Sequence, residues 1–573
     1  MTATVRPTAG LRPWRVVVAA AVGTLAVGIG IAAGSFLLST RTDLGAGSAY
    51  VPASAPFYFE VRLEPSAAQD AALRELLGRF PEIDGVDLDR PLHDQLVEHL
   101  DQMLAAEDVD VSWTADVAPW FDGHVAIALI DIPLEMAEML DPMAPPPVPP
   151  AVILLGVTDR AAAAAAIERL SAEGGAPEFT ETEHAGVTVH VASGSELGAW
   201  ALTADQLIIG TDASAVTTAI DTQANSSESL AGKPDMTRLT DALPSDWLAF
   251  ATYDMTDLMT QAFDSAAAMD PAMAQVFQDM LEHQPLRGAM AVSAGGDRFR
   301  LDASSDPPTG PFAVENSELG LSGEVPGDVL YYSEAANVGA ALAGAIGPIK
   351  EAVITLPDGA EQIDMIESAL GADLEEVVTW IGDMAVAAGI DGETPYGGLV
   401  IIPSDMEAGE RRLAQLTSFA TLGALDPTSG VTVDEEDVSG VTVTTIRWED
   451  PNATPDMMPP GFGGVSLEWA TTDDRVLIGV GDTFVRRVLG LDEGDSLASQ
   501  ARFTDAVAGL GGSSNAGVLW IDVAGLSDAL VAVMGPMPGA DEALGWLEPL
   551  DSFVSVTRLE GDVLVQRAAL LVD

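Results

Sequence analysis

The stretch VPASAPFYFE at residues 51–60 returns as VPGDVLYYSE at residues 325–334, with a Val-Pro pair, an aromatic pair and a glutamate at the same spacing. A second echo follows in the same order, AGVTV at residues 185–189 and SGVTV at residues 439–443. Collinear echoes along two halves of a chain are the signature of an internal duplication. The sequence therefore predicts that the fold is built from two copies of one module.

Further echoes extend this match and set the boundaries of the two copies. We predict a first module at residues 51–305 and a second at residues 325–573, joined by a linker at 306–324 that is rich in Pro, Gly, Ser and acidic residues. The additional echoes are TADQLIIG (203–210) with TDDRVLIG (472–479), RLTDA (238–242) with RFTDA (502–506), and Gly296-Asp297 with Gly561-Asp562.

Each module alternates β-branched runs with alanine-rich helical runs. Residues 57–63 alternate apolar and polar side chains, residues 152–157 form a continuous apolar run, and residues 160–170 are helical in composition. Asp254 and Asp522 precede apolar helical stretches, where an aspartate caps the helix N-terminus. We predict an α+β fold with mainly antiparallel sheets and with helices on one face.

The N-terminal segment predicts a membrane anchor. Residues 16–38 carry no charge and would span about 35 Å as a helix, enough for one crossing. Three arginines lie in the basic segment 1–15 and all 88 acidic residues follow the apolar run, so the N-terminus is expected in the cytoplasm and the bulk of the chain outside the plasma membrane. Residues 39–50 are the expected juxtamembrane linker. The alternative is a cleaved secretory signal, whose apolar region is normally shorter.

The composition excludes several classes of protein. The chain of 573 residues has 25 Lys and Arg against 88 Asp and Glu, a net charge of −63, and no cysteine. Without cysteine there is no disulfide scaffold, zinc-thiolate centre or cysteine nucleophile, and the acidic surface disfavours nucleic acid as a partner. With 48% hydrophobic residues the chain can fold around cores. No cofactor is expected.

Local catalytic motifs are missing, so the search for chemistry rests on carboxylates. All six histidines lie in the first module, which excludes a duplicated histidine site, and no phosphate-binding loop or nucleophile elbow occurs. Glu60 and Glu334 hold the same place in the two modules and are the candidate catalytic pair. The alternative interpretation is that Glu60 lies on an exposed strand face beside Arg62.

Methionines cluster near residues 255–280. Met255, Met259, Met273 and Met280 are candidates for an apolar groove that would hold a lipid tail or an apolar peptide. Ordinary packing of flexible side chains in helix cores is the alternative, and copper(I) ligation by thioethers is a more remote one.

The opening of the first module, residues 51–61 followed by Glu64-Pro65-Ser66 and Phe80-Pro81, resembles a bacterial family known only as domain of unknown function 3352. The resemblance implies an N-terminal transmembrane segment, a long duplicated exported region and no assigned activity. It carries over no catalytic residue.

Three functional hypotheses follow from the sequence. The first is a non-catalytic envelope protein that binds an apolar ligand or another envelope protein and is held to the membrane by its N-terminal helix. The second is a carboxylate-dependent hydrolase of an envelope polymer that uses Glu60 and Glu334. The third is a structural subunit of a larger membrane complex.

Overall fold

The computed structural model describes most of the chain beyond the predicted anchor. The described residues are 45–81, 83, 85–106, 112–132, 149–173, 179–192, 198–269, 274–275, 278, 281–356, 358–392, 394–425, 430–448, 465–492, 494–534 and 540–573. The predicted transmembrane helix at 16–38 lies outside them, and no helix among the described residues is long and apolar enough to span a bilayer. The chain forms two compact units, Met1–Ala262 with Leu286–Ser305, and Phe263–Pro285 with Asp306–Asp573.

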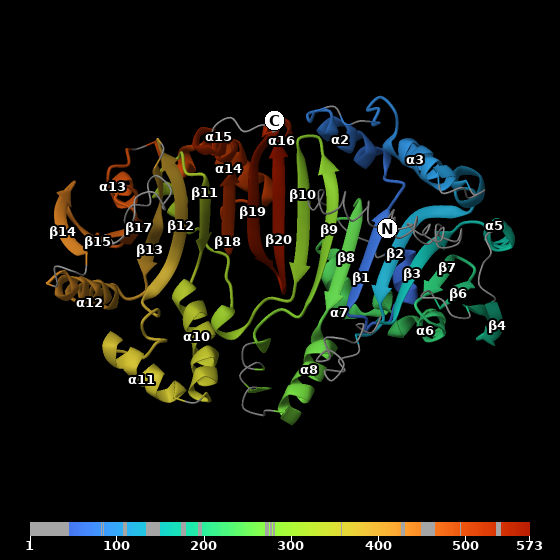
Figure 1. The fold of residues 1–573 in the computed structure, drawn as a ribbon, viewed down its shortest axis with the longest axis horizontal. Coiled ribbons are helices and arrows are strands. Elements are labelled where there is room, and N and C mark those ends of the chain that lie inside the picture. Colours follow the sequence, from blue (N-terminus) through green and yellow to red (C-terminus); the bar gives the residue numbers. More distant parts are fainter. Residues whose placement is uncertain are drawn as a thin grey trace, which may run out of the picture. The chain divides into compact units, whose positions relative to one another are not determined.

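The first unit is built on an antiparallel sheet (Figure 1). Neighbouring strands pair in the order β4-β5-β6-β7-β3-β2-β1-β8-β9-β10. The strands are β1 (Phe57–Arg62), β2 (Phe121–Leu129), β3 (Ala151–Val157), β4 (Phe179–His184), β5 (Val187–Ala192), β6 (Ala199–Leu202), β7 (Gln206–Gly210), β8 (Ala249–Asp254), β9 (Arg287–Gly295) and β10 (Arg298–Ser305).

The sheet of the second unit repeats this order strand for strand, as β14-β15-β16-β17-β13-β12-β11-β18-β19-β20. Every pairing is again antiparallel, so the α+β class and the antiparallel sheets are as predicted. The strands are β11 (Tyr331–Ala335), β12 (Ile381–Asp391), β13 (Thr394–Pro403), β14 (Val431–Val438), β15 (Val441–Trp448), β16 (Val465–Thr471), β17 (Val476–Val480), β18 (Gly517–Asp522), β19 (Leu550–Glu560) and β20 (Val563–Val572).

Helices and short helical turns connect these strands. Around the first sheet they are η1 (Ala46–Tyr50), α2 (Ala67–Leu77), α3 (Leu92–Ala106), η2 (Trp113–Val117), α5 (Arg160–Glu173), α6 (Ala213–Ala224), η3 (Ser226–Glu228), η4 (Leu230–Gly232), α7 (Pro234–Asp241) and α8 (Thr256–Met269). Around the second they are η5 (Gly310–Phe312), η6 (Leu321–Gly323), α10 (Val338–Ile354), α11 (Gly359–Leu370), α12 (Met406–Ala424), α13 (Phe484–Leu489), η8 (Leu497–Ser499), α14 (Ala501–Leu510), α15 (Val523–Met534) and α16 (Ala540–Leu547).

Helices cover both faces of the first sheet, and the prediction of helices on one face is wrong. On one face, Ile153 of β3 packs in a core with Leu100 of α3 and Ala163 of α5. On the other, Gly210 of β7 lies against Val216 of α6. The reason is visible in β3, where every residue from Val152 to Val157 is buried, because a strand buried on both sides needs cover on both sides.

The second sheet is covered in the same way. Consecutive residues of β13 point to opposite faces. Val400 belongs to the core that contains Phe484 of α13 and Phe503 of α14, whereas Ile401 belongs to the core that contains Leu413 of α12. Each unit is therefore a three-layer arrangement with its sheet in the middle.

The duplicated turns and caps have matching geometry. Ala185 and Gly186 have φ of 49° and 80°, and Ser439 and Gly440 have φ of 55° and 86°, the pattern of a tight hairpin turn that matches strand twist. Asp254 accepts a hydrogen bond from the main-chain nitrogen of Thr256 at 3.0 Å, and Asp522 accepts one from Gly525 at 2.8 Å. The predicted caps are confirmed.

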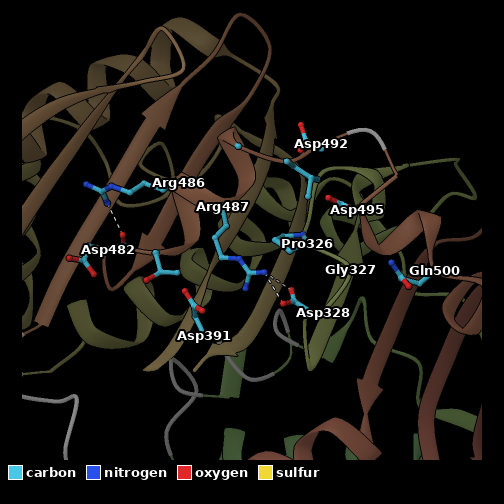
Figure 2. A pocket seen from close by; sticks show the side chains of 13 residues that line it. Pro326, Gly327, Asp328, Asp391, Asp482, Arg486, Arg487, Asp492, Asp495 and Gln500 are labelled. Atoms are coloured by element: carbon cyan, nitrogen blue, oxygen red, sulfur yellow. Dashed lines mark hydrogen bonds and ion pairs between the residues drawn. The ribbon is translucent and has the colours of Figure 1, made fainter. Parts of the chain in front are cut away.

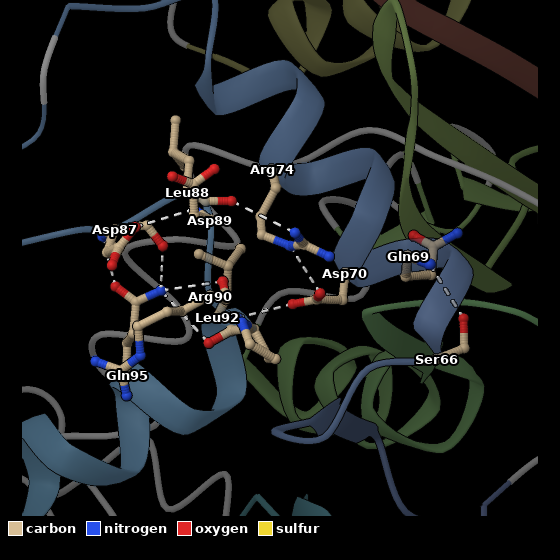
Figure 3. A network of polar contacts seen from close by, with 11 residues as sticks. Ser66, Gln69, Asp70, Arg74, Asp87, Leu88, Asp89, Arg90, Leu92 and Gln95 are labelled. Carbon is tan, nitrogen blue, oxygen red and sulfur yellow. Dashed lines mark hydrogen bonds and ion pairs between the residues drawn. The ribbon is translucent and has the colours of Figure 1, made fainter.

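A polar network fixes the connection between α2 and α3 (Figure 3). The half-buried guanidinium of Arg74 donates to Asp70 at 2.9 Å, and the main-chain nitrogen of Leu92 donates to the same carboxylate at 2.8 Å. Gln95 of α3 bonds the main chain of Asp87 in the connecting loop through both ends of its amide. These polar contacts thus hold the loop to both helices.

Candidate functional site

Glu60, the first predicted carboxylate, is buried in the middle of its sheet. Its side chain is 1% exposed, and the interpretation that it lies on an exposed strand face is wrong. The hydroxyl of Tyr58 donates to one carboxylate oxygen at 2.5 Å, and Nδ1 of His124 lies 2.6 Å from the other. The His124 side chain is 34% exposed, so this imidazole stands between the buried carboxylate and solvent.

The segment just before β1 closes the site around Glu60. A side chain at Gly45 would collide with the Glu60 carboxylate, since an added Cβ would lie 1.9 Å from it. Gly47 of η1 packs in the same way against the hydroxyl of Tyr58 and against Leu154. Part of the stretch predicted as a juxtamembrane linker is therefore packed on the sheet. Glycine is needed there because the main chain must approach closely.

Glu334 repeats the arrangement in the second unit. It is 9% exposed, and the hydroxyl of Tyr332 donates to it at 2.7 Å. Burial raises the pKa of the Glu334 carboxyl, and the nearby charge of Asp383 adds to the rise. The strand registers place Ala126 opposite Glu60 and Ala385 opposite Glu334, so Asp383 holds the position that His124 holds in the first unit.

These geometries define what the two glutamates can do chemically. Each has a tyrosine partner in its own unit, and each is enclosed by protein. A buried carboxyl with a raised pKa is a property of general acids, but a general acid must also come within hydrogen-bond distance of its substrate. The enclosure of Glu60 and Glu334 fits a structural hydrogen-bond network better than a catalytic site.

The candidate methionine groove is described only in part. Met255 precedes α8 and Met259 lies in its first turn, and both side chains are half-buried. Met273 and Met280 lie outside the described residues. A groove formed by these four side chains therefore stays a prediction.

The second unit contains a polar cavity of about 700 Å³ that sequence reasoning missed (Figure 2). Its residues come from the loop before β11, the end of β12, and α13 with the segments on either side of it, and because these parts are distant in the chain no local motif marks the cavity. The lining consists of Pro326, Gly327, Asp328, Asp391, Asp482, Thr483, Arg486, Arg487, Gly490, Leu491, Asp492, Asp495 and Gln500.

Both arginines of the cavity are held by fixed partners. The guanidinium of Arg487 donates to both oxygens of Asp328, at 2.8 and 2.7 Å, and lies over the Tyr396 ring at 4.8 Å from its centre. Arg486 donates to Glu468 at 2.6 Å. Glu468 is fully buried, and this burial raises the pKa of its carboxyl. The positive charges in the wall are therefore already committed.

The lining carries an excess of negative charge. Five aspartates face two arginines, which leaves three excess carboxylates. The echoes at Val-Pro and at the Ile-Gly ends of β7 and β17 place Ser54, Thr217 and Thr218 where the second unit has Asp328, Arg486 and Arg487. These three charges of the cavity thus belong to the second unit alone. Among the described residues, no group of three or more His, Asp or Glu is arranged to hold a metal ion.

Comparison with known proteins gives a family match and remote structural likenesses. The family model described as "Protein of unknown function (DUF3352)" matches residues 16–541. A solved structure titled "Structure of crystal form III of TP0453" is similar over 46% of this chain and 80% of its own, with 8% identity and a TM-score of 0.22. Crystal form IV of TP0453 is similar over 45% and 94%, with 12% identity and a TM-score of 0.20. No curated protein matches the chain.

Proposed function

We propose that this chain, which belongs to the DUF3352 family of proteins of unknown function, is a membrane-anchored extracytoplasmic protein that binds a ligand without catalysing a reaction. The uncharged run at 16–38 is the proposed anchor, with the basic segment 1–15 in the cytoplasm. The observation that supports ligand binding is the cavity of the second unit, whose volume falls within the range of small-molecule sites.

The charge of the cavity favours a cationic ligand. Arg487 is paired with Asp328 in the wall and Arg486 with the buried Glu468 outside the lining, so an anion would meet no uncommitted positive charge there. Asp391, Asp492 and Asp495 also line the cavity (Figure 2). An ammonium or guanidinium group would offset their mutual repulsion and form charge-assisted hydrogen bonds with them. We therefore expect a small molecule or peptide end that bears two or three positive charges.

Isothermal titration calorimetry on the full chain in mild detergent tests this proposal. Spermidine is the cationic probe, and succinate is the anionic control. We expect spermidine to bind, succinate to give no binding heat, and added salt to weaken the spermidine signal because it screens the carboxylates. The double variant Asp391→Asn with Asp495→Asn is expected to lose most of the affinity.

The matched control replaces two exposed acidic residues of the same unit that lie outside the cavity, Asp364→Asn with Asp473→Asn. It changes the net charge by the same amount and is expected to bind spermidine as the wild type does. An equal loss of affinity in both double variants would mean that spermidine responds to the overall charge of the protein. If the wild type does not bind spermidine, the proposal of a cationic ligand is wrong.

The anchor has its own test. Membranes that contain the full chain are washed at alkaline pH, which strips peripheral proteins and leaves spanning helices in place. We expect the full chain to stay with the membrane and a chain that lacks residues 1–38 to be released. Protease added to intact cells should digest the region from residue 45 onward.

A hydrolase of an envelope polymer is the second candidate function. The observation in its favour is the duplicated pair of a tyrosine and a buried glutamate, Tyr58 with Glu60 and Tyr332 with Glu334. Any hydrolysis that survives both Glu60→Gln and Glu334→Gln would remove this candidate. Native mass spectrometry of the protein extracted from its own membrane tests the third hypothesis, because a structural subunit would carry partner chains in fixed ratio.

A further inference from the structure

Large apolar side chains are exposed on three neighbouring helices of the second unit. Isolated exposed apolar side chains are common, but a concentration of them marks a contact surface. We define the apolar helical surface by the exposed members of α10, α11 and α12 and of the turns that follow α10 and α12. They are Leu342, Ile349, Ile354, Leu356, Met365, Ile366, Leu416, Phe419, Leu422 and Leu425, with Leu425 75% and Met365 68% exposed.

The three helices are held together by polar contacts. Lys350 of α10 lies 2.6 Å from Glu367 of α11 and 3.1 Å from Glu375 in the loop beyond it. Arg412 of α12 donates to the carbonyl oxygen of Leu370, at the end of α11. The lysine contacts fix α10 against α11, and the bond from Arg412 links the end of α11 to α12. Figure 1 shows α10 and α11 side by side in the second unit, with α12 beyond them next to β14.

The α12 part of the apolar helical surface has few charges of its own. Residues 413–425 contain no charged side chain, and neither do residues 338–349 of α10. Lys350 pairs with Glu367 and Glu375, which leaves one excess negative charge, and the exposed Glu351, Glu361 and Asp364 add further negative charge on α10 and α11. Removing this surface from water would therefore bury apolar area without stranding unpaired charges along α12.

We propose that the apolar helical surface rests on the zwitterionic lipid of the membrane that holds the anchor, with Met365, Phe419 and Leu422 among the lipid head groups. This inference rests on the anchor proposed above. A second copy of the chain is a poorer occupant, because two molecules with a net charge of −63 repel each other. Zwitterionic lipid has no net charge and no such penalty.

The length of chain before the first unit supports the same occupant. Six residues, 39–44, separate the apolar run from Gly45, which is fixed against Glu60. Fully extended, six residues reach about 20–22 Å, so the anchor keeps the first unit close to the lipid. Because the second unit belongs to the same chain, the anchor also raises the effective concentration of lipid around it, and a weaker apolar contact then suffices for binding.

Site-directed spin labelling on the full chain tests the inference. The chain has no cysteine, so each introduced cysteine is the sole labelling site. Met365→Cys, Phe419→Cys and Leu422→Cys carry a nitroxide, and each variant is reconstituted into phosphatidylcholine vesicles. The control is Glu407→Cys, at the start of α12, where the side chain is 89% exposed. All four positions lie on the surface, so labelling should leave the fold intact.

The readout is collision of the nitroxide with oxygen, which concentrates in lipid, relative to a water-soluble nickel chelate. We expect a several-fold higher oxygen-to-nickel ratio at positions 365, 419 and 422 than at 407. Equal ratios at all four positions would overturn the inference while leaving the anchor intact, provided that the chain resists alkaline extraction. Dipolar broadening between labels on different molecules would show that a second copy of the chain, and not lipid, covers this surface. Release of the full chain by alkali would overturn the anchor and this inference together.

Discussion

Glu60 and Glu334 hold equivalent positions on β1 and β11, and each accepts a hydrogen bond from the tyrosine two residues before it. The position next to each carboxylate differs between the units, with His124 in the first and Asp383 in the second. The same part of the fold therefore places an imidazole next to the buried glutamate in one unit and a second carboxylate next to it in the other.

Glu60→Gln is expected to destabilise the first unit by about 1–3 kcal/mol. The amide keeps the volume of the side chain but replaces one of the two acceptor oxygens that face Tyr58 and His124 with an N–H donor, and the negative charge that strengthens both contacts is lost. Urea unfolding of the full chain in mild detergent measures the change. A double-mutant cycle compares Glu60→Gln, His124→Gln and the variant that carries both changes. If the losses of stability in the two single variants simply add up in the double variant, the two side chains are not coupled.

Glu334→Gln is expected to change how stability depends on pH. Burial and the charge of Asp383 raise the pKa of Glu334 above its ordinary value, so the folded state binds this proton more tightly than the unfolded state. The resulting stability is present below the ordinary glutamate pKa and is lost as pH rises through the raised value. Glutamine cannot ionise, so the variant does not lose stability in this way as pH rises.

The measurement is the urea midpoint of wild type and variant from pH 4 to pH 8. We expect the variant to gain stability relative to the wild type as pH rises across this range. Glu367→Gln is the comparison, since Lys350 and the main chain of Leu374 lower the pKa of Glu367 and its effect has the opposite sign. Parallel pH profiles for Glu334→Gln and the wild type would contradict the raised pKa.

Features carried by neighbouring residues could be predicted from the sequence. The repeated Gly-Val-Thr-Val stretches predicted the duplication, and the aspartates before the apolar helical stretches predicted the helix caps because cap chemistry depends on a few adjacent residues. The β-branched runs gave the antiparallel α+β class. The apolar run at 152–157 also held the evidence for helices on both faces, since only a strand covered on two sides remains apolar throughout.

Features made by distant residues could not be predicted. Strand alternation places Glu60 and Tyr58 on one face, but the pattern does not show that Gly45 and Gly47 close over them. The cavity joins Asp328 to Arg487 across 159 positions, and neither residue belongs to a motif. The first unit has the same fold but gives no indication of this ion pair, because it has uncharged residues at the equivalent positions.

Lys233→Met is expected to cost about 3 kcal/mol of stability. The Lys233 ammonium donates to Asp254 at 2.6 Å and to the carbonyl oxygen of Ala53 at 2.8 Å, and Asp254 is 7% exposed. Removing the lysine leaves a buried carboxylate without its cation, which is more costly than the loss of an exposed ion pair. Thermal unfolding followed by circular dichroism measures the change.

The cation that pairs with the equivalent aspartate of the second unit provides the comparison. Arg502 pairs with Asp522 and with Asp551, and the three side chains are 37%, 19% and 12% exposed. Because water reaches these carboxylates more readily than it reaches Asp254, Arg502→Met is expected to cost less than Lys233→Met, about 1–2 kcal/mol. A smaller loss of stability for Lys233→Met than for Arg502→Met would show that the burial of Asp254 does not determine how much its ion pair contributes to the stability of the protein.

Ala185→Asn and Ser439→Asn are each expected to stabilise the protein by about 0.5–1 kcal/mol. Both residues have positive φ at the first central position of a two-residue hairpin turn and are followed by glycine. Asparagine tolerates this conformation better than alanine or serine, and Asn-Gly is the favoured pair for this turn type. Gly186→Val and Gly440→Val are expected to destabilise, since a β-branched residue at φ near 80° is strained. Urea unfolding of the four variants tests both directions, and stabilisation by valine would show that these turns adopt a different conformation.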